Sequence, residues 1–190
     1  CVPRRGVLFA LFASASGLAP VGVIGSTGKL GRRAVKKLAS AGIPVRALSR
    51  SKGGIAFPSD AADASSAEVA SWLATLEGVT LVEGDVTDAA SVAELLAGCS
   101  ACLALHGARR STKLTDLLPW VDEESEPTHS KQINYEGTRT IIGAMRKTGC
   151  RRIVRVTGKG ETPWSIFSIL INGFGSMAKA WNYEGEMLLR

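Results

Sequence analysis

Short apolar runs alternate along this chain with longer segments in which apolar residues recur at helical spacing. The short runs predict strands at residues 21–24, 45–48, 79–82, 101–105 and 153–156. The longer segments predict helices at residues 28–41, 65–76, 88–97, 131–147 and 175–190. Strands that alternate with helices are typical of a parallel sheet whose strands are joined by right-handed crossovers. We therefore predict an α/β fold: a doubly wound parallel sheet of at least five strands in the order 3-2-1-4-5, with helices on both faces.

The ends of the predicted helices carry local signals. The first helix is expected to bury one apolar face, formed by Leu30, Ala34, Val35 and Leu38. Gly42 is its predicted stop. Ser65 and Glu68 have the spacing of a capping box, which marks the start of the second helix. The polar stretch 107–130 is longer than most connections inside compact domains, so we expect it to be functional or mobile.

The composition is that of an ordinary globular protein with one domain. The chain has 190 residues, of which 45% are hydrophobic and 21% are charged. The net charge is +6, and the basic clusters at 32–37, 109–110 and 151–155 are interpreted as solvated helix faces and loop ends. No basic stripe is interleaved with aromatic residues, so nucleic-acid binding is not predicted. No residue cluster predicts a metal site.

The four cysteines are Cys1, Cys99, Cys102 and Cys150. The C-x-x-C spacing of Cys99 and Cys102 is compatible with a redox pair. We favour two buried strand thiols, because the pair leads into the apolar stretch 103–105 and free cysteine packs as a small hydrophobe. A disulfide framework is not expected with so large a core, so a reducing compartment is predicted.

The first 19 residues allow two interpretations. The chain begins at Cys1, and Arg4 and Arg5 precede an apolar run at 7–12 that ends in small residues. This pattern is typical of the remnant of a targeting sequence, which would place the protein in the plastid stroma or another organelle. The alternative is an ordinary lead-in to the first strand, with a cytoplasmic location. The run is too short for a transmembrane segment, so none is predicted.

The stretch that carries chemistry runs from Val21 to Gly31, where an apolar strand meets a Gly-rich turn and then a helix. Gly25 allows a tight turn, and Gly28 lets backbone N–H groups approach a pyrophosphate. Gly31 lets the helix pack closely on the strand. The helix N-terminus adds a favourable dipole and free N–H donors. Strand, turn, helix and second strand together predict a Rossmann-type dinucleotide site in residues 20–190.

The end of the second strand favours NADP(H) over NAD(H). NAD sites usually carry a carboxylate there for the ribose 2′-hydroxyl, whereas a 2′-phosphate needs cations. Arg50 offers a planar fork suited to phosphate, with Ser51 and Lys52 next to it. The alternative is that Arg50 is a solvated strand end.

Several stretches in this order resemble the atypical and extended short-chain dehydrogenase/reductases, and in particular their NmrA-like NAD(P)-binding group. The resemblance covers the chain from about Pro20 onward. Its motifs are Gly25-Ser26-Thr27-Gly28-Lys29-Leu30-Gly31, Ala47-Leu48-Ser49-Arg50, Glu83-Gly84-Asp85-Val86-Thr87-Asp88, Asn134-Tyr135-Glu136-Gly137-Thr138 and Arg151-Arg152-Ile153-Val154-Arg155-Val156-Thr157. Relatives continue further, so we expect the substrate-side part to be absent after Arg190.

The resemblance completes the expected cofactor site, which consists of Gly25, Ser26, Thr27, Gly28, Lys29, Leu30, Gly31, Arg50, Ser51, Asp85, Val86, Leu105, His106, Gly107, Asn134 and Thr157. It implies that Asp85 and Val86 lie beside the adenine, and that residues 105–107 border the ribose on the nicotinamide side. Asn134 would face the active site from its helix. Thr157 would lie at the tip of the fifth strand, where the family often has a catalytic Ser or Thr.

The chain departs from the family at the catalytic pair. Active relatives carry Tyr-x-x-x-Lys, in which the lysine lowers the tyrosine pKa for acid–base work. No such spacing occurs here, and the family's frame puts Ala178 and Asn182 at those two positions. Lys179 and Tyr183, four residues apart, are an alternative pair on one helical face. With Thr157 they are the only catalytic candidates.

Three functions are therefore weighed. The favoured one is an NADP(H)-binding protein without ordinary catalysis, such as a redox sensor or a plastid assembly factor with a protein partner. The alternative is an NADPH-dependent reductase of a carbonyl or quinone-like substrate with a non-standard active site. The third, an interaction module that has lost its cofactor, is disfavoured because the Gly-rich turn is intact.

Overall fold

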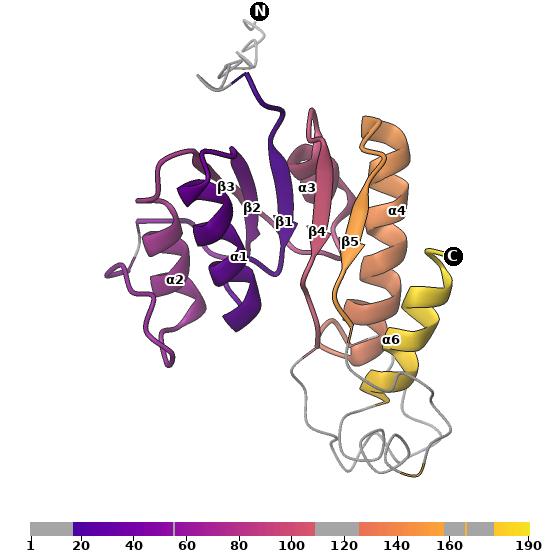
Figure 1. Cartoon of the computed structure of the whole chain (residues 1–190). Coiled ribbons are helices and arrows are strands. Elements are labelled where there is room, and N and C mark those ends of the chain that lie inside the picture. Colours follow the sequence, from indigo (N-terminus) through magenta and orange to yellow (C-terminus); the bar gives the residue numbers. More distant parts are fainter. Residues whose placement is uncertain (1–16, 55, 109–125, 158–165, 167–176) are drawn as a thin grey trace, which may run out of the picture.

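Five parallel strands form one sheet in the computed structural model, which describes residues 17–54, 56–108, 126–157, 166 and 177–190 (Figure 1). The strands are β1 (Val21–Ile24), β2 (Val45–Ser49), β3 (Val79–Glu83), β4 (Ala101–Ala104) and β5 (Ile153–Arg155). Their order is β3-β2-β1-β4-β5, and each neighbouring pair is parallel. Val21, for example, pairs with Val45 on one side and Ala101 on the other. The predicted parallel sheet and its strand order are confirmed.

Helices cover both faces of this sheet, as predicted. They are α1 (Lys29–Ser40), α2 (Ser66–Leu73), α3 (Ala89–Leu96), the short π-helix η3 (Lys131–Glu136), α4 (Gly137–Thr148) and α6 (Ala178–Met187). In Figure 1, α1 and α2 lie on one face, α3 and α4 lie on the other, and α6 lies beside α4. None of the helices in the described ranges is both long and apolar enough to cross a membrane.

Alternating strand residues build two separate cores. Val23 and Ala47 pack with α1 and α2 on one face, whereas the next residues along the chain, Ile24 and Leu48, pack with α3 and α4 on the other. Successive strand side chains point to opposite faces, and both faces here are covered by helices. The central strands are therefore apolar throughout, which is why they are recognisable as short continuous runs.

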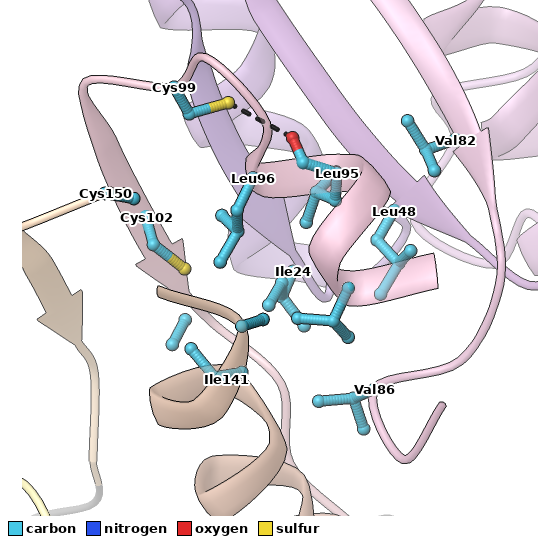
Figure 2. Packing of buried hydrophobic residues seen from close by; sticks show 13 residues of the cluster. Ile24, Leu48, Val82, Val86, Leu95, Leu96, Cys99, Cys102, Ile141 and Cys150 are labelled. Atoms are coloured by element: carbon cyan, nitrogen blue, oxygen red, sulfur yellow. Dashed lines mark hydrogen bonds between the residues drawn. The ribbon is translucent and has the colours of Figure 1, made fainter. Parts of the chain in front are cut away.

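The core between the sheet and α3–α4 contains the described thiols (Figure 2). Cys102 lies in β4 and is fully buried, as predicted. The prediction that Cys99 is also a strand thiol is wrong, because it lies in the turn after α3, where its Sγ donates to Leu95 O at 3.1 Å. Cys150 joins the same cluster, and all three thiols are free. Cys1 lies outside the described residues.

The first helix buries a narrower face than its sequence predicts. Leu30 was expected on the buried side but is 49% exposed, so this prediction is wrong. Gly31, Arg32 and Val35 form the buried side instead, because the helix rests on the Gly-rich turn through Gly31. Arg32 was interpreted as a solvated residue and is in fact buried, donating from Nη1 to Ala61 O at 2.6 Å.

Two other helices also depart from their predicted form. The single helix predicted for 131–147 begins as the π-helical turn η3 and continues as α4, which ends at Gly149 with a φ of 75°. The helix predicted for 175–190 is shorter and runs over Ala178–Met187; residues 175 and 176 lie outside the described ranges. The capping box is confirmed: Ser65 N donates to Glu68 Oε2 at 2.8 Å, and Glu68 N to Ser65 Oγ at 3.3 Å. Of the predicted excursion 107–130, residues 109–125 also lie outside the described ranges.

Candidate functional site

The Gly-rich turn joins the carboxyl end of β1 to the start of α1. Gly25 has a φ of +80°, and Gly28 N donates to Gly25 O at 3.1 Å, which closes the turn. The first hydrogen bond of the helix runs from Arg32 N to Gly28 O, and no side chain caps this end. The N–H groups of residues 29–31 therefore have no acceptor within the helix. An anion placed at this end would meet three donors and the positive end of the helix dipole.

Two glycines allow the backbones around this turn to touch. A Cβ on Gly31 would overlap the carbonyl oxygen of Gly25 and lie 2.8 Å from Ser26 Cα. A Cβ on Gly25 would lie 2.7 Å from His106 N and 2.8 Å from Leu105 O. The loop that follows β4 thus lies directly against the turn, and the structure brings two groups of predicted site residues together.

The end of β2 is fastened to the same turn. The buried Ser26 hydroxyl donates to Leu48 O at 2.6 Å. Ser49 Oγ donates to Ser51 O at 2.9 Å and accepts from Ser51 N at 3.2 Å, which shapes the chain around Arg50. Arg50 is exposed, and its side chain makes no ion pair within the described residues.

The next basic residue differs from Arg50 in its surroundings. Lys52 Nζ lies 3.3 Å from Glu83 Oε2 at the end of β3. Its charge is therefore partly engaged within the protein. Of these two predicted cations, Arg50 is the one that has no ion pair with any described residue where β2 ends.

The segment after β3 forms a hydrogen-bonded corner next to the end of β2, where Gly84 N donates to Ser49 O at 2.9 Å. Asp85 Oδ1 accepts hydrogen bonds from Thr87 N at 3.0 Å and from Thr87 Oγ1 at 2.9 Å. Val86 is buried, and a Cβ on Gly137 would lie 3.1 Å from its methyl groups. The corner thus packs against the first turn of α4, so the predicted adenine-side residues lie at the carboxyl edge of the sheet.

His106 is a neutral imidazole at the end of β4. Burial lowers the pKa of His106 to about 4, the positive charge of Arg155 lowers it too, and the Asp85 carboxylate acts in the opposite direction. Neither ring nitrogen has a hydrogen-bond partner within the described part of the chain. A neutral imidazole has one donor and one acceptor nitrogen, so His106 can engage a polar ligand group without gaining charge.

Asn134 connects the loop after β4 to α6. Its Oδ1 accepts from Ala108 N at 3.1 Å, and its Nδ2 donates to Ala178 O at 3.3 Å. The side chain is 1% exposed. Leu105, His106 and Gly107 immediately precede this tethered loop, so Asn134 holds the predicted nicotinamide-side segment in place.

Arg155 is a residue that sequence reasoning missed. It was grouped with the solvated basic residues at 151–155, and for this residue that interpretation is wrong. Its guanidinium donates to Thr138 Oγ1, to Asn134 O at 3.1 Å and to Asn182 Oδ1 at 3.0 Å. The one signal in the sequence is a charged residue inside the apolar strand pattern Ile-Val-Arg-Val. Thr157 lies half-buried, two residues beyond the end of β5.

Helix α6 presents the remaining catalytic candidates. Lys179 and Tyr183 are both half-buried on this helix. Trp181 lies against η3, with its ring 5.9 Å from that of Tyr135 and 5.2 Å from Lys131 Nζ. Within the described residues, no group of three or more His, Cys, Asp or Glu side chains is arranged to hold a metal ion.

Comparison with known proteins agrees with this geometry. A family model described as NAD(P)H-binding matches residues 25–188, which includes the Gly-rich turn and all of α6. Among curated proteins, none matches the chain in sequence.

Solved structures with a similar fold include a short-chain dehydrogenase/reductase, a uronate dehydrogenase and NmrA. A wide-type short-chain dehydrogenase/reductase from Veillonella parvula, in complex with NADP, is 9% identical with a TM-score of 0.59 over 90% of this chain. A mutant uronate dehydrogenase from Agrobacterium tumefaciens complexed with NAD is 22% identical with a TM-score of 0.54 over 90%. A mutant NmrA is 14% identical with a TM-score of 0.51 over 78%.

This chain spans 63%, 54% and 36% of the lengths of those three proteins, which is less than two thirds in each case. At these identities the likeness concerns the fold. The family match rests instead on the sequence of most of the chain, and the turn, the helix N-terminus and the sheet order are those that a dinucleotide site requires. The chain therefore belongs to the NAD(P)H-binding family of Rossmann-type proteins.

Proposed function

We propose that this protein binds NADP(H) in preference to NAD(H), and that it acts as a regulatory or assembly-type member of its family without ordinary dehydrogenase activity. The observation that carries the cofactor preference is Arg50. It lies exposed and without an ion pair in the described part of the chain, where β2 ends and a carboxylate would favour NAD. Structures of the same fold have been solved in complex with NADP and with NAD, so the fold supports a nicotinamide dinucleotide and Arg50 carries the preference.

The non-catalytic part of the proposal rests on α6. In the family's frame, Ala178 and Asn182 occupy the tyrosine and lysine positions. Ala178 has no proton to transfer, and its carbonyl accepts from Asn134. Asn182 carries no charge, and its Oδ1 accepts from Arg155. General acid–base catalysis contributes about 10²–10⁴-fold to rates, so we expect its loss to leave binding without appreciable turnover.

Arg50→Asp tests the cofactor preference. Hydrogen bonds to charged groups are worth about 1.5–3 kcal/mol, so the substitution should weaken NADPH binding by roughly 10–150-fold in titration calorimetry. NADH binding should stay the same or improve. Arg151→Asp is the matched control, because Arg151 is exposed at the opposite end of the sheet, just before β5. Equal affinity of the parent chain for NADPH and NADH would refute the preference.

A second candidate is an NADPH-dependent reductase with a non-standard site. Two observations favour it: the neutral imidazole of the half-buried His106, and Lys179 with Tyr183 on one helix. The absorbance of NADPH over a panel of carbonyl and quinone substrates separates the two functions. We expect NADPH to raise the melting temperature while its absorbance stays constant. Brisk turnover that is lost in Tyr183→Phe would establish the reductase instead.

Residues 20–190 are proposed as the cofactor domain, and residues 1–19 as a targeting remnant for a plastid or another organelle. The support for targeting is the basic start followed by an apolar run and small residues. Imaging of the chain fused to a fluorescent protein, with and without residues 1–19, tests the location. The partner of an assembly factor would be a protein, and co-purification from that organelle with and without NADPH would identify it.

A further inference from the structure

Arg155 reaches from the end of β5 to three oxygens on other elements. One is the hydroxyl of Thr138 at the start of α4, one is the carbonyl of Asn134 in η3, and one is the side-chain amide of Asn182 in α6. Thr138 Oγ1 itself donates to Asn134 O at 2.7 Å. A single guanidinium thus joins β5 to three helical elements, namely η3, the start of α4, and α6.

The close approach of α6 depends on a glycine. A Cβ on Gly185 would lie 2.5 Å from Asn134 O and 2.6 Å from Arg155 Nη1. Gly185 is buried, and the backbone of α6 contacts the guanidinium directly at this residue. The helix can approach the η3 carbonyl and the Arg155 guanidinium this closely because Gly185 places no side chain between them.

The same hydrogen bonds continue to the loop after β4. Arg155 fixes the carbonyl of Asn134, whose side chain bonds both Ala108 N and Ala178 O. Charge coupling also links Arg155 to His106, because the guanidinium is one cause of the lowered pKa of that imidazole. One connected set of contacts therefore sets the positions of residues 105–108 and the start of α6.

The adenine side is fastened by different contacts. Ser26 bonds Leu48 O, Ser49 bonds Ser51, and Asp85 bonds Thr87. None of these three hydrogen bonds involves β5, η3 or α6. The two halves of the expected cofactor site are therefore held by separate hydrogen-bond sets.

We propose that Arg155 is a positioning residue for the nicotinamide half of the cofactor. This inference rests on the proposed function, because it requires that NADP(H) binds along the carboxyl edge of the sheet. Arg155 holds the loop after β4 and the N-terminal end of α6 in the arrangement that receives the nicotinamide and its ribose. It does so from β5, where it supplies the positive charge that Asn182 lacks at the family's lysine position.

The test compares NADPH with 2′,5′-ADP, which contains only the adenine half of the cofactor, by titration calorimetry. Arg155→Met removes the charge and its donors while keeping a long apolar side chain. We expect it to weaken NADPH binding by about tenfold or more and to leave 2′,5′-ADP binding nearly unchanged. Arg155→Lys keeps the charge with fewer directed donors, so its loss of NADPH affinity should be smaller.

Two further variants make the test independent of folding. Asn182→Ala removes a single acceptor of Arg155, so it should weaken NADPH binding less than Arg155→Met does. If Arg155→Met does not fold, Asn182→Ala and Arg155→Lys together test the proposal. Arg46→Met is the matched control: Arg46 is also a strand arginine that donates to a backbone carbonyl, Ala97 O at 2.7 Å, but it lies near the start of β2. Its affinities for both ligands should equal those of the parent.

The outcomes separate this inference from the proposed function. Equal weakening of NADPH and 2′,5′-ADP in the Arg155 and Asn182 variants would overturn the positioning role, because a general loss of structure affects both halves. Unchanged NADPH affinity in those variants would overturn it as well. A parent chain that binds neither ligand would instead refute the proposed function, and this inference with it.

Discussion

Gly31→Ala is the substitution whose effect the structure determines most directly. The added Cβ would overlap the carbonyl oxygen of Gly25 and lie 2.8 Å from both Gly25 C and Ser26 Cα. These are backbone atoms, so the turn itself must move for the methyl group to fit. Such overpacking costs about 1–3 kcal/mol. Replacing glycine with alanine within a helix stabilises the helix by about 1 kcal/mol, which offsets part of this cost.

The two contributions leave a net loss of at most about 2 kcal/mol, or a fall of up to roughly 8 °C in the melting temperature of a domain of this size. Cofactor binding should suffer more than stability does. A shifted turn misaligns the N–H groups at the start of α1, and each charge-assisted bond that is lost is worth about tenfold or more in affinity.

The assays are thermal melting and titration with NADPH. Gly143→Ala is the matched control, because Gly143 lies within α4 and an added Cβ there would meet no atom within 4 Å. That variant should gain about 0.5–1 kcal/mol and bind the cofactor like the parent. If Gly31→Ala melted as high as the parent and bound NADPH equally well, the close contact of helix and turn would not be what forms the site.

Three further predictions concern buried and capping groups. Burial raises the pKa of Cys99 to about 11 and that of Cys102 to about 12, so a thiol reagent at pH 8 should label neither until the protein is unfolded; rapid labelling would contradict this. Because the pKa of His106 is lowered to about 4, the unfolded state binds more protons, and stability should fall as pH drops from about 6.5 to 4. In urea titrations over this pH range, the free energy of unfolding of His106→Gln should decline less steeply than that of the parent. Ser65→Ala should cost about 1 kcal/mol through loss of the capping box, with an unchanged melting temperature as the contrary result.

Local sequence patterns were sufficient to predict the strands, the helices and the Gly-rich turn. The strands were recognisable because both faces of the sheet are covered, and the capping box because Ser65 and Glu68 bond each other within one helical turn. The Gly-rich turn was equally predictable, since Gly25 has a positive φ and Gly31 has no room for a Cβ beside the backbone of the turn. That these residues bind NADP(H) stays a prediction.

Local sequence patterns gave wrong or missing predictions where contacts with distant elements determine the structure. Leu30 satisfied the helical period, but the contact of Gly31 with the turn rotated that side chain into solvent. Cys99 was assigned to the strand because an apolar stretch follows it, but it lies between α3, which ends at Leu96, and β4. The π-helical turn η3 has no signature in the hydrophobic period, and its Asn134 carbonyl is held by Thr138 and Arg155.

The sequence by itself determined the alternation of strands and helices, the parallel order of the sheet and the Gly-rich turn, because each depends on neighbours within a few residues or on the handedness of crossovers. Only the tertiary structure decided that Arg155 is an internal anchor rather than a solvated charge. Its acceptors on Thr138 and Asn182 are 17 and 27 residues away in the chain. A pattern of hydrophobic and polar residues tells which face of a strand a side chain occupies, but not which oxygens of other elements the fold brings to it.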